Sequence, residues 1–160
     1  MPRTLQTYLE SATPNAAKDL ITAYLRLPED KRDWSPMGDA RTALDQIAEC
    51  AILNGYVAQT LKSHEFIMGD DYEGEKKSVQ KDWNALKALF DENTAKAVAA
   101  ITETSDEDLE IQVTTPWGEP MKLSQIAAYP FWNMCYHEGQ INYIASMLGC
   151  LESDVPNREQ

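Results

Sequence analysis

The chain has 160 residues and a mass of 18.0 kDa, which is the size of one domain and enough to bury a core without disulfides. Its 26 acidic and 14 basic residues give a formal net charge of -12. Because this charge repels phosphate backbones and anionic lipid headgroups, the composition argues against nucleic acid and membranes as partners.

The cysteines and the hydropathy pattern indicate a soluble cytoplasmic protein. The three cysteines, Cys50, Cys135 and Cys150, form no C-x-x-C pair, so neither a disulfide framework nor a zinc ribbon is indicated. Residues 1–10 lack the apolar run of a signal peptide, and no segment approaches the roughly 20 apolar residues of a membrane span. We therefore expect a single domain over residues 1–160, located in the reducing cytoplasm.

The spacing of apolar residues predicts four helices, and no strand pattern competes with them. The first helix is centred on residues 17–25, begins at Pro14 after a shorter turn within residues 1–13, and stops before Pro28. The second helix covers about residues 41–62 and carries a stripe of small residues that allows a neighbouring helix to come close.

A crossover with glycines and carboxylates follows at residues 63–74, and we expect it to be mobile. The third helix is predicted to begin near Glu75 and to extend to about Ile101, with apolar residues at spacings of three, four and seven. Residues 111–115 alternate like a short extended segment before a turn at residues 116–120.

The fourth helix is expected from Leu123 or Ser124 to Gly149, where glycine can adopt the left-handed conformation that ends a helix. Pro130 is a candidate for a kink in this helix. Residues 152–160 form a polar tail that we expect to fray.

The last helix places polar residues on its apolar face. At about 100° per residue, Asn133, His137 and Gln140 fall in the same sector as Ile141 and Ile144. Buried polar groups are costly unless they are paired, so His137 requires a partner. The sequence leaves open whether this partner is a side chain, a water molecule or a metal ion.

The order of these elements and two short motifs resemble the DinB/YfiT-like family of four-helix bundles. The motifs are residues 115–118, Thr-Pro-Trp-Gly, before the last helix and residues 137–141, His-Glu-Gly-Gln-Ile, within it. The resemblance covers nearly the whole chain and implies an all-α four-helix bundle with long crossover connections. Members of the family commonly bind a divalent metal such as zinc or nickel, through one histidine on the second helix and two histidines four residues apart on the last.

This chain departs from that ligand pattern at two of three positions. His137 matches the last ligand, whereas Asn133 and, on an ungapped comparison, Glu49 stand where the family has histidine. The only other histidine is His64, so a three-histidine site is excluded. A set of Glu49, Asn133 and His137, with Gln140 behind it, could hold a divalent ion, but an amide oxygen is a weak donor for zinc. We therefore expect the metal site to be weakened or lost.

The bundle can also satisfy these side chains without an ion. In that arrangement Glu49 accepts a hydrogen bond from His137, and Asn133 completes a small polar network. The helical position of Glu49, about 140° from the centre of the small-residue stripe, also allows this side chain to face solvent.

Three functions remain open from the sequence. The resemblance implies a metal-dependent transferase or hydrolase for a small molecule, with no catalytic residue assigned. Because two of the three expected histidines are replaced, a non-catalytic module that binds a small ligand without metal is favoured instead. The fold itself does not decide between these functions, since function depends on the site. The third is a structural homodimer, because dimers are common in the family and Trp132, Tyr136 and Tyr143 lie away from the polar stripe.

Overall fold

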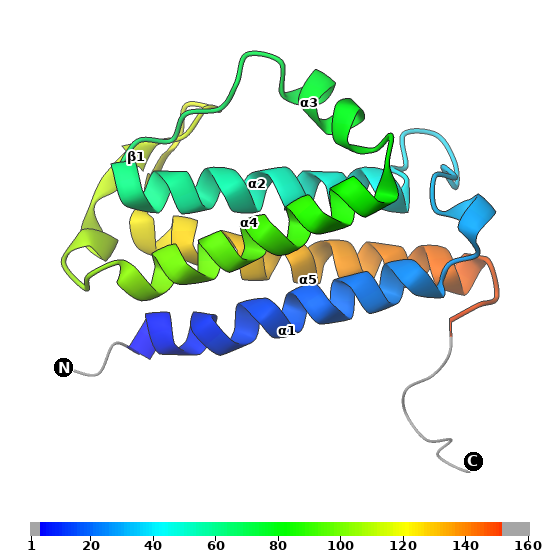
Figure 1. The fold of residues 1–160 in the computed structure, drawn as a ribbon, viewed down its shortest axis with the longest axis horizontal. Coiled ribbons are helices and arrows are strands. Elements are labelled where there is room, and N and C mark those ends of the chain that lie inside the picture. Colours follow the sequence, from blue (N-terminus) through cyan, green and yellow to red (C-terminus); the bar gives the residue numbers. More distant parts are fainter. Residues whose placement is uncertain (1–3, 152–160) are drawn as a thin grey trace, which may run out of the picture.

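The structure is a computed structural model that describes residues 4–151. Four long helices form a bundle: α1 (Thr4–Arg26), α2 (Ala43–Ser63), α4 (Trp83–Glu103) and α5 (Leu123–Met147). The remaining elements are a short helix α3 (Tyr72–Val79), two 3-10 turns (Glu29–Lys31 and Asp108–Glu110) and two strands, β1 (Gln112–Thr114) and β2 (Pro120–Lys122). Figure 1 shows the long helices side by side, with α3 outside the bundle in the connection between α2 and α4.

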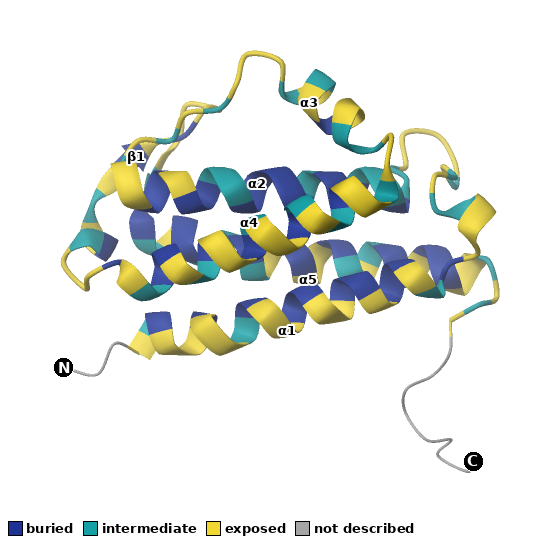
Figure 2. Ribbon diagram, viewed as in Figure 1, coloured by how far each residue is buried: buried dark blue, intermediate teal, exposed yellow. Residues whose placement is uncertain are grey.

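The order of the helices around the bundle differs from their order along the chain. Helix α2 packs on α4 and α5, and α1 packs on the same two helices, so α1 and α2 lie diagonally opposite each other. Fully buried side chains line the interior from all four helices, among them Leu20, Ile47, Phe90 and Ile141 (Figure 2). The prediction of an all-α four-helix bundle with long crossover connections is confirmed.

The small-residue stripe of α2 brings α4 close, as predicted. A Cβ atom added to Gly55 would lie 2.7 Å from the amide nitrogen of Asn93 on α4. That same nitrogen donates a hydrogen bond to the carbonyl oxygen of Ala51, at 2.8 Å. A side chain at position 55 would therefore displace the Asn93 amide and break its hydrogen bond to Ala51.

The predicted helix start at Pro14 is wrong, because α1 begins at Thr4 and continues through this proline. Proline lacks the N–H group that would donate to the preceding turn, which usually weakens a helix. Here Leu9 and Thr13 before the proline are buried on the same side as Ala17 and Leu20 after it. Packing against the bundle thus holds both halves of α1 in line.

The predicted third helix is divided in two. Helix α3 ends at Val79, and α4 begins only at Trp83. Asp82 separates them, because its backbone is extended and its carboxylate accepts hydrogen bonds from the N–H groups of Asn84, at 2.8 Å, and Ala85, at 3.2 Å. This N-cap fixes the start of α4 at a position that the apolar spacing did not reveal.

The remaining expectations concern the last part of the chain. The extended segment is confirmed as β1, which pairs antiparallel with β2 across the predicted turn. Helix α5 contains Pro130 and ends at Met147, and Gly149 has the expected positive φ of 69°. The predicted polar tail, residues 152–160, lies outside the described residues. Within residues 4–151, none of the helices combines the length and the apolar character that a membrane span requires.

Thr42 caps the N-terminus of α2. Its hydroxyl oxygen accepts a hydrogen bond from the N–H group of Asp45, at 3.1 Å. We expect Thr42→Ala to lower the free energy of unfolding by about 1 kcal/mol, as loss of an N-cap usually does. Thr42→Ser retains the hydroxyl and should stay close to the wild type in urea unfolding. An equal loss in both variants would show that the methyl group, and not the cap, stabilises this helix.

Candidate functional site

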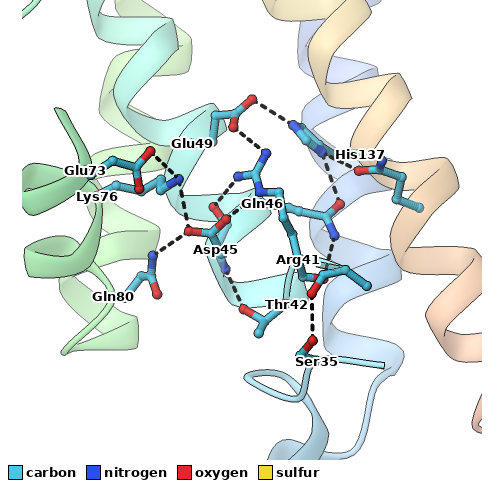
Figure 3. A network of polar contacts seen from close by, with 12 residues as sticks. Ser35, Arg41, Thr42, Asp45, Gln46, Glu49, Glu73, Lys76, Gln80 and His137 are labelled. Atoms are coloured by element: carbon cyan, nitrogen blue, oxygen red, sulfur yellow. Dashed lines mark hydrogen bonds and ion pairs between the residues drawn. The ribbon is translucent and has the colours of Figure 1, made fainter. Parts of the chain in front are cut away.

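A polar cluster, formed by Arg41, Glu49 and His137, links the start of α2 to α5. Nε2 of His137 lies 2.9 Å from Oε1 of Glu49, and Nη1 of Arg41 lies 2.6 Å from Oε2 of the same carboxylate. The His137 side chain is 2% exposed and that of Glu49 is 15% exposed. One carboxylate therefore binds two nitrogen donors, and it is largely buried (Figure 3).

The second ring nitrogen of His137 faces two glutamine side chains. Nδ1 lies 3.1 Å from Oε1 of Gln46 on α2 and 2.9 Å from Oε1 of Gln140 on α5. An amide group can present either its oxygen or its NH2 group. The two glutamines can therefore satisfy Nδ1 whether or not it carries a proton, and both ring nitrogens of His137 have protein partners.

The electrostatics of the polar cluster keep Glu49 ionised. Burial by itself would raise the pKa of Glu49, but the hydrogen bond from His137 and the charge of Arg41 together lower it from 4.5 to about 2. Burial disfavours the charged form of Arg41 as well and would lower its pKa. The charges and hydrogen bonds of Glu49 and Asp45 raise this pKa, and the net shift is upward. Arg41 and Glu49 thus form a stable ion pair beside the buried imidazole.

Further contacts join the polar cluster to α3. Asp45 accepts from Nε of Arg41 and also pairs with Nζ of Lys76 on α3, at 3.3 Å. The Lys76 side chain is only 8% exposed and also contacts Glu73, at 3.1 Å (Figure 3). Burial, followed by the charge of Glu49, raises the pKa of Tyr72 at the start of α3. Helix α3 therefore covers the α2 side of the site.

Asn133, the third predicted ligand, forms its hydrogen bond with Cys50 and not with Glu49 or His137. It is buried one turn before His137, and its amide nitrogen donates to Sγ of Cys50 at 3.6 Å. Burial raises the pKa of the Cys50 thiol well above its usual range, which makes it a packing residue and not a nucleophile. The structure thus brings Glu49, His137 and Gln140 together and directs Asn133 to a different partner.

A pocket of about 650 Å³ opens beside the polar cluster, between the loop before α2 and the C-terminal half of α5. We call it the α5 pocket. Arg41, Gln46 and Gln140 form its polar wall. The other lining residues are mainly apolar or aromatic: Pro36, Met37, Asp39, Ala40, Tyr136, Gly139, Tyr143, Ile144 and Met147. A small number of polar groups in a mostly apolar pocket is the usual composition of a small-molecule site.

A larger groove, of about 890 Å³, lies between α1 and α4. Its lining includes Ala17, Ile21, Phe90 and Val98 and shares no residue with the polar cluster. Because size alone does not define a site, we regard the smaller α5 pocket as the candidate.

Sequence reasoning missed Arg41 and Gln46 as members of the site. Arg41, Asp45 and Glu49 are spaced four residues apart, which places them on one side of a helix and could have indicated a charged row. No comparable signal pointed to Gln46, because its contact with His137 depends on how α2 is rotated toward α5.

The donor set of the polar cluster does not match a family-type metal site. Glu49 and His137 could supply two ligands, but the second carboxylate oxygen holds the Arg41 guanidinium and Asn133 bonds Cys50. A fixed positive charge next to the ligands opposes a divalent cation. Among the described residues, no three His, Cys, Asp or Glu side chains gather into a group that could hold a metal ion.

Comparison with known proteins finds the same fold among solved structures. No protein-family model matches the sequence, and no curated protein matches it. Among solved structures, YfiT from Bacillus subtilis, described as a probable metal-dependent hydrolase with an unusual four-helix bundle topology, aligns with a TM-score of 0.75 and 14% identity, over 90% of this chain and 87% of that one.

Two other structures show the same likeness. The DinB-like protein YjoA from Bacillus subtilis aligns with a TM-score of 0.66 and 14% identity, over 96% of this chain and 98% of that one. A mycothiol-dependent maleylpyruvate isomerase aligns with a TM-score of 0.62 and 16% identity, over 94% of this chain but only 64% of that one.

The molecule is a helical bundle with an Arg–Glu–His cluster between two of its helices. Its fold is that of the DinB/YfiT-like proteins, as the resemblance implied.

Proposed function

We propose that this protein binds a small organic molecule in the α5 pocket without a metal ion. The observation that carries the proposal is the shared wall: Gln46 and Gln140 line the pocket and also contact Nδ1 of His137. A polar group on the ligand would hydrogen-bond these amides, while its apolar part would lie against Tyr136, Tyr143 and Ile144. Arg41 supplies the positive charge that neutralises Glu49, so the polar cluster requires no ion for its stability.

Gly139 offers a direct test, because it lines the pocket and a Cβ atom added there would meet nothing within 4 Å. The expected result is that Gly139→Leu fills the pocket and blocks binding, while stability is kept or improved, since leucine favours a helix over glycine. The measurement is a fragment screen by protein-observed NMR, run with EDTA present. Ser146→Leu, at an exposed position of α5 outside the pocket, is the matched control.

Fragments that shift the resonances of pocket residues, and that are blocked only by Gly139→Leu, would support the proposal. If no fragment binds, or if both leucine variants bind fragments equally well, the proposal is wrong.

A second candidate is a metal-assisted transferase or hydrolase. Two observations favour it: Glu49 and His137 are in contact at the positions where the resemblance places ligands, and YfiT is a probable metal-dependent hydrolase. The ion would be zinc or nickel, and its chemistry would be activation of a water molecule or a thiol. The Arg41 guanidinium argues against this candidate, because it already occupies one oxygen of the carboxylate.

Metal analysis distinguishes the two candidates. After incubation with zinc, nickel or manganese and desalting, we expect no stoichiometric ion to remain on the wild-type protein. Retention of an ion that is lost in His137→Ala would favour the metal-assisted enzyme instead. Arg41→Gln serves as a companion variant, because it removes the competing charge and should increase metal retention if Arg41 is what excludes the ion.

The homodimer expected from the sequence stays a prediction. Trp132, Tyr136 and Tyr143 are more than half exposed on α5, and a second copy could cover them. Sedimentation equilibrium of the wild type and of Trp132→Ser tests this prediction.

A further inference from the structure

The charged groups of the α5 pocket indicate what kind of ligand it accepts. Of its lining residues, only Asp39 and Arg41 carry a charge at neutral pH. All three nitrogens of the Arg41 guanidinium already have protein partners. Nε bonds the carboxylate of Asp45, Nη2 bonds the carbonyl oxygen of Asp45 at 3.3 Å, and Nη1 bonds Glu49 at 2.6 Å. These contacts use three of the five N–H donors of the guanidinium, and the carboxylates of Asp45 and Glu49 offset its positive charge. Arg41 therefore gives an anionic ligand little net attraction.

Asp39 is in the opposite situation. It is exposed in the loop before α2. None of the ion pairs within residues 4–151 involves its carboxylate. The whole chain carries a net charge of -12, so the surrounding field attracts cations. A positively charged ligand group would gain both the field of the protein and a direct contact with Asp39.

The aromatic wall of the pocket suits the same kind of ligand. Tyr136 is held by stacking on Trp132, with ring centroids 5.5 Å apart and an interplanar angle of 17°. Its ring also meets the His137 ring edge-on, at 5.3 Å. Tyr136 is 51% exposed and Tyr143 is 68% exposed. Tyrosine ring faces attract ammonium groups through the negative potential above the ring.

We infer that the molecule bound in the α5 pocket is an organic cation, an ammonium group that carries an apolar or aromatic body. This inference rests on the function proposed above. The ammonium group lies near Asp39 and the two tyrosines, while the apolar body packs on Ile144 and Met147. Any hydrogen-bonding group of the ligand reaches the Gln140 amide.

Three probes of similar size and different charge test the inference. They are benzyltrimethylammonium, the neutral benzyl alcohol and the anionic phenylacetate, each titrated into the isotope-labelled protein and followed by NMR. We expect the cation to bind most tightly and phenylacetate to bind at least about tenfold more weakly, because the field and Asp39 both oppose it. Added salt should weaken binding of the cation and leave benzyl alcohol unaffected.

Two variants locate the effect. Asp39→Asn and Tyr143→Leu should each weaken binding of the cation by about threefold, the effect of one exposed ion pair or one exposed cation–π contact. Benzyl alcohol should be unaffected by Asp39→Asn. Asp70→Asn changes the net charge equally at an exposed site outside the pocket, so it separates the direct contact from the general field.

The outcomes separate this inference from the proposed function. If Gly139→Leu blocks neutral fragments but the cation has no advantage over phenylacetate, the inference is wrong and the proposed function stands. If Asp39→Asn and Asp70→Asn have equal effects, the specific role of Asp39 is refuted. Absence of binding by every probe and every fragment overturns both proposals. Sedimentation of the same samples shows whether a second copy of the chain covers the pocket.

Discussion

Replacing Glu49 by glutamine should lower the free energy of unfolding by about 3 kcal/mol at neutral pH. Glutamine keeps the size of the side chain but removes the charge that Arg41 and His137 bind. A lowering of the Glu49 pKa from 4.5 to about 2 corresponds to a stabilisation of this size. Only 15% of the side chain is exposed, so solvent screens the interaction little. Urea unfolding of the wild type and of Glu49→Gln measures the difference.

A matched control is available in Glu110, which pairs with Lys122 at 2.6 Å but is 69% exposed. Glu110→Gln should change the free energy of unfolding by less than about 1 kcal/mol, as is usual for a surface ion pair. A double-mutant cycle with Arg41→Gln should give a coupling of at least about 1 kcal/mol to Glu49. Equal losses in Glu49→Gln and Glu110→Gln would mean that burial of the polar cluster adds nothing to stability.

The fold could be predicted from the sequence to the extent that local spacing determines it. Helix α2 follows the predicted range to within two residues, and Gly149 has the expected conformation, because apolar period and glycine backbone freedom act locally. The two errors, at Pro14 and Asp82, have opposite causes. In α1, tertiary packing overrides a local helix breaker, whereas a local cap at Asp82 interrupts an apolar stripe that otherwise continues.

The site was predictable only in part. The position of the polar His137 on an apolar helix face indicated a buried partner, and the resemblance pointed to Glu49. In the structure, Oε1 of Glu49 lies 2.9 Å from Nε2 of His137. The roles of Arg41 and Gln46 depend on the rotation and spacing of α2 relative to α5, which helical periodicity does not determine. Asn133 was predicted to join the same group, but a buried sulfur atom within reach of its amide provides a different partner.

The loss caused by Glu49→Gln should disappear in acid. The folded-state pKa of Glu49 is lowered to about 2 from 4.5, so between these values the unfolded chain binds a proton that the folded chain does not. Stability from this group is therefore fully present above about pH 4.5 and is lost as the pH falls toward 2. The difference between the wild type and Glu49→Gln should fall from about 3 kcal/mol to near zero over this range.

Urea unfolding of both proteins at several pH values measures this difference, and the other carboxylates cancel because they titrate in both. A difference that stays constant down to low pH would show that Glu49 stabilises the fold as a hydrogen-bonding group irrespective of its charge. In that case the charge of Arg41 would no longer argue against a divalent cation, and the metal-assisted candidate would gain support. A difference that vanishes in acid would instead mean that the charge of Arg41 and the hydrogen bond from His137 keep the buried carboxylate ionised.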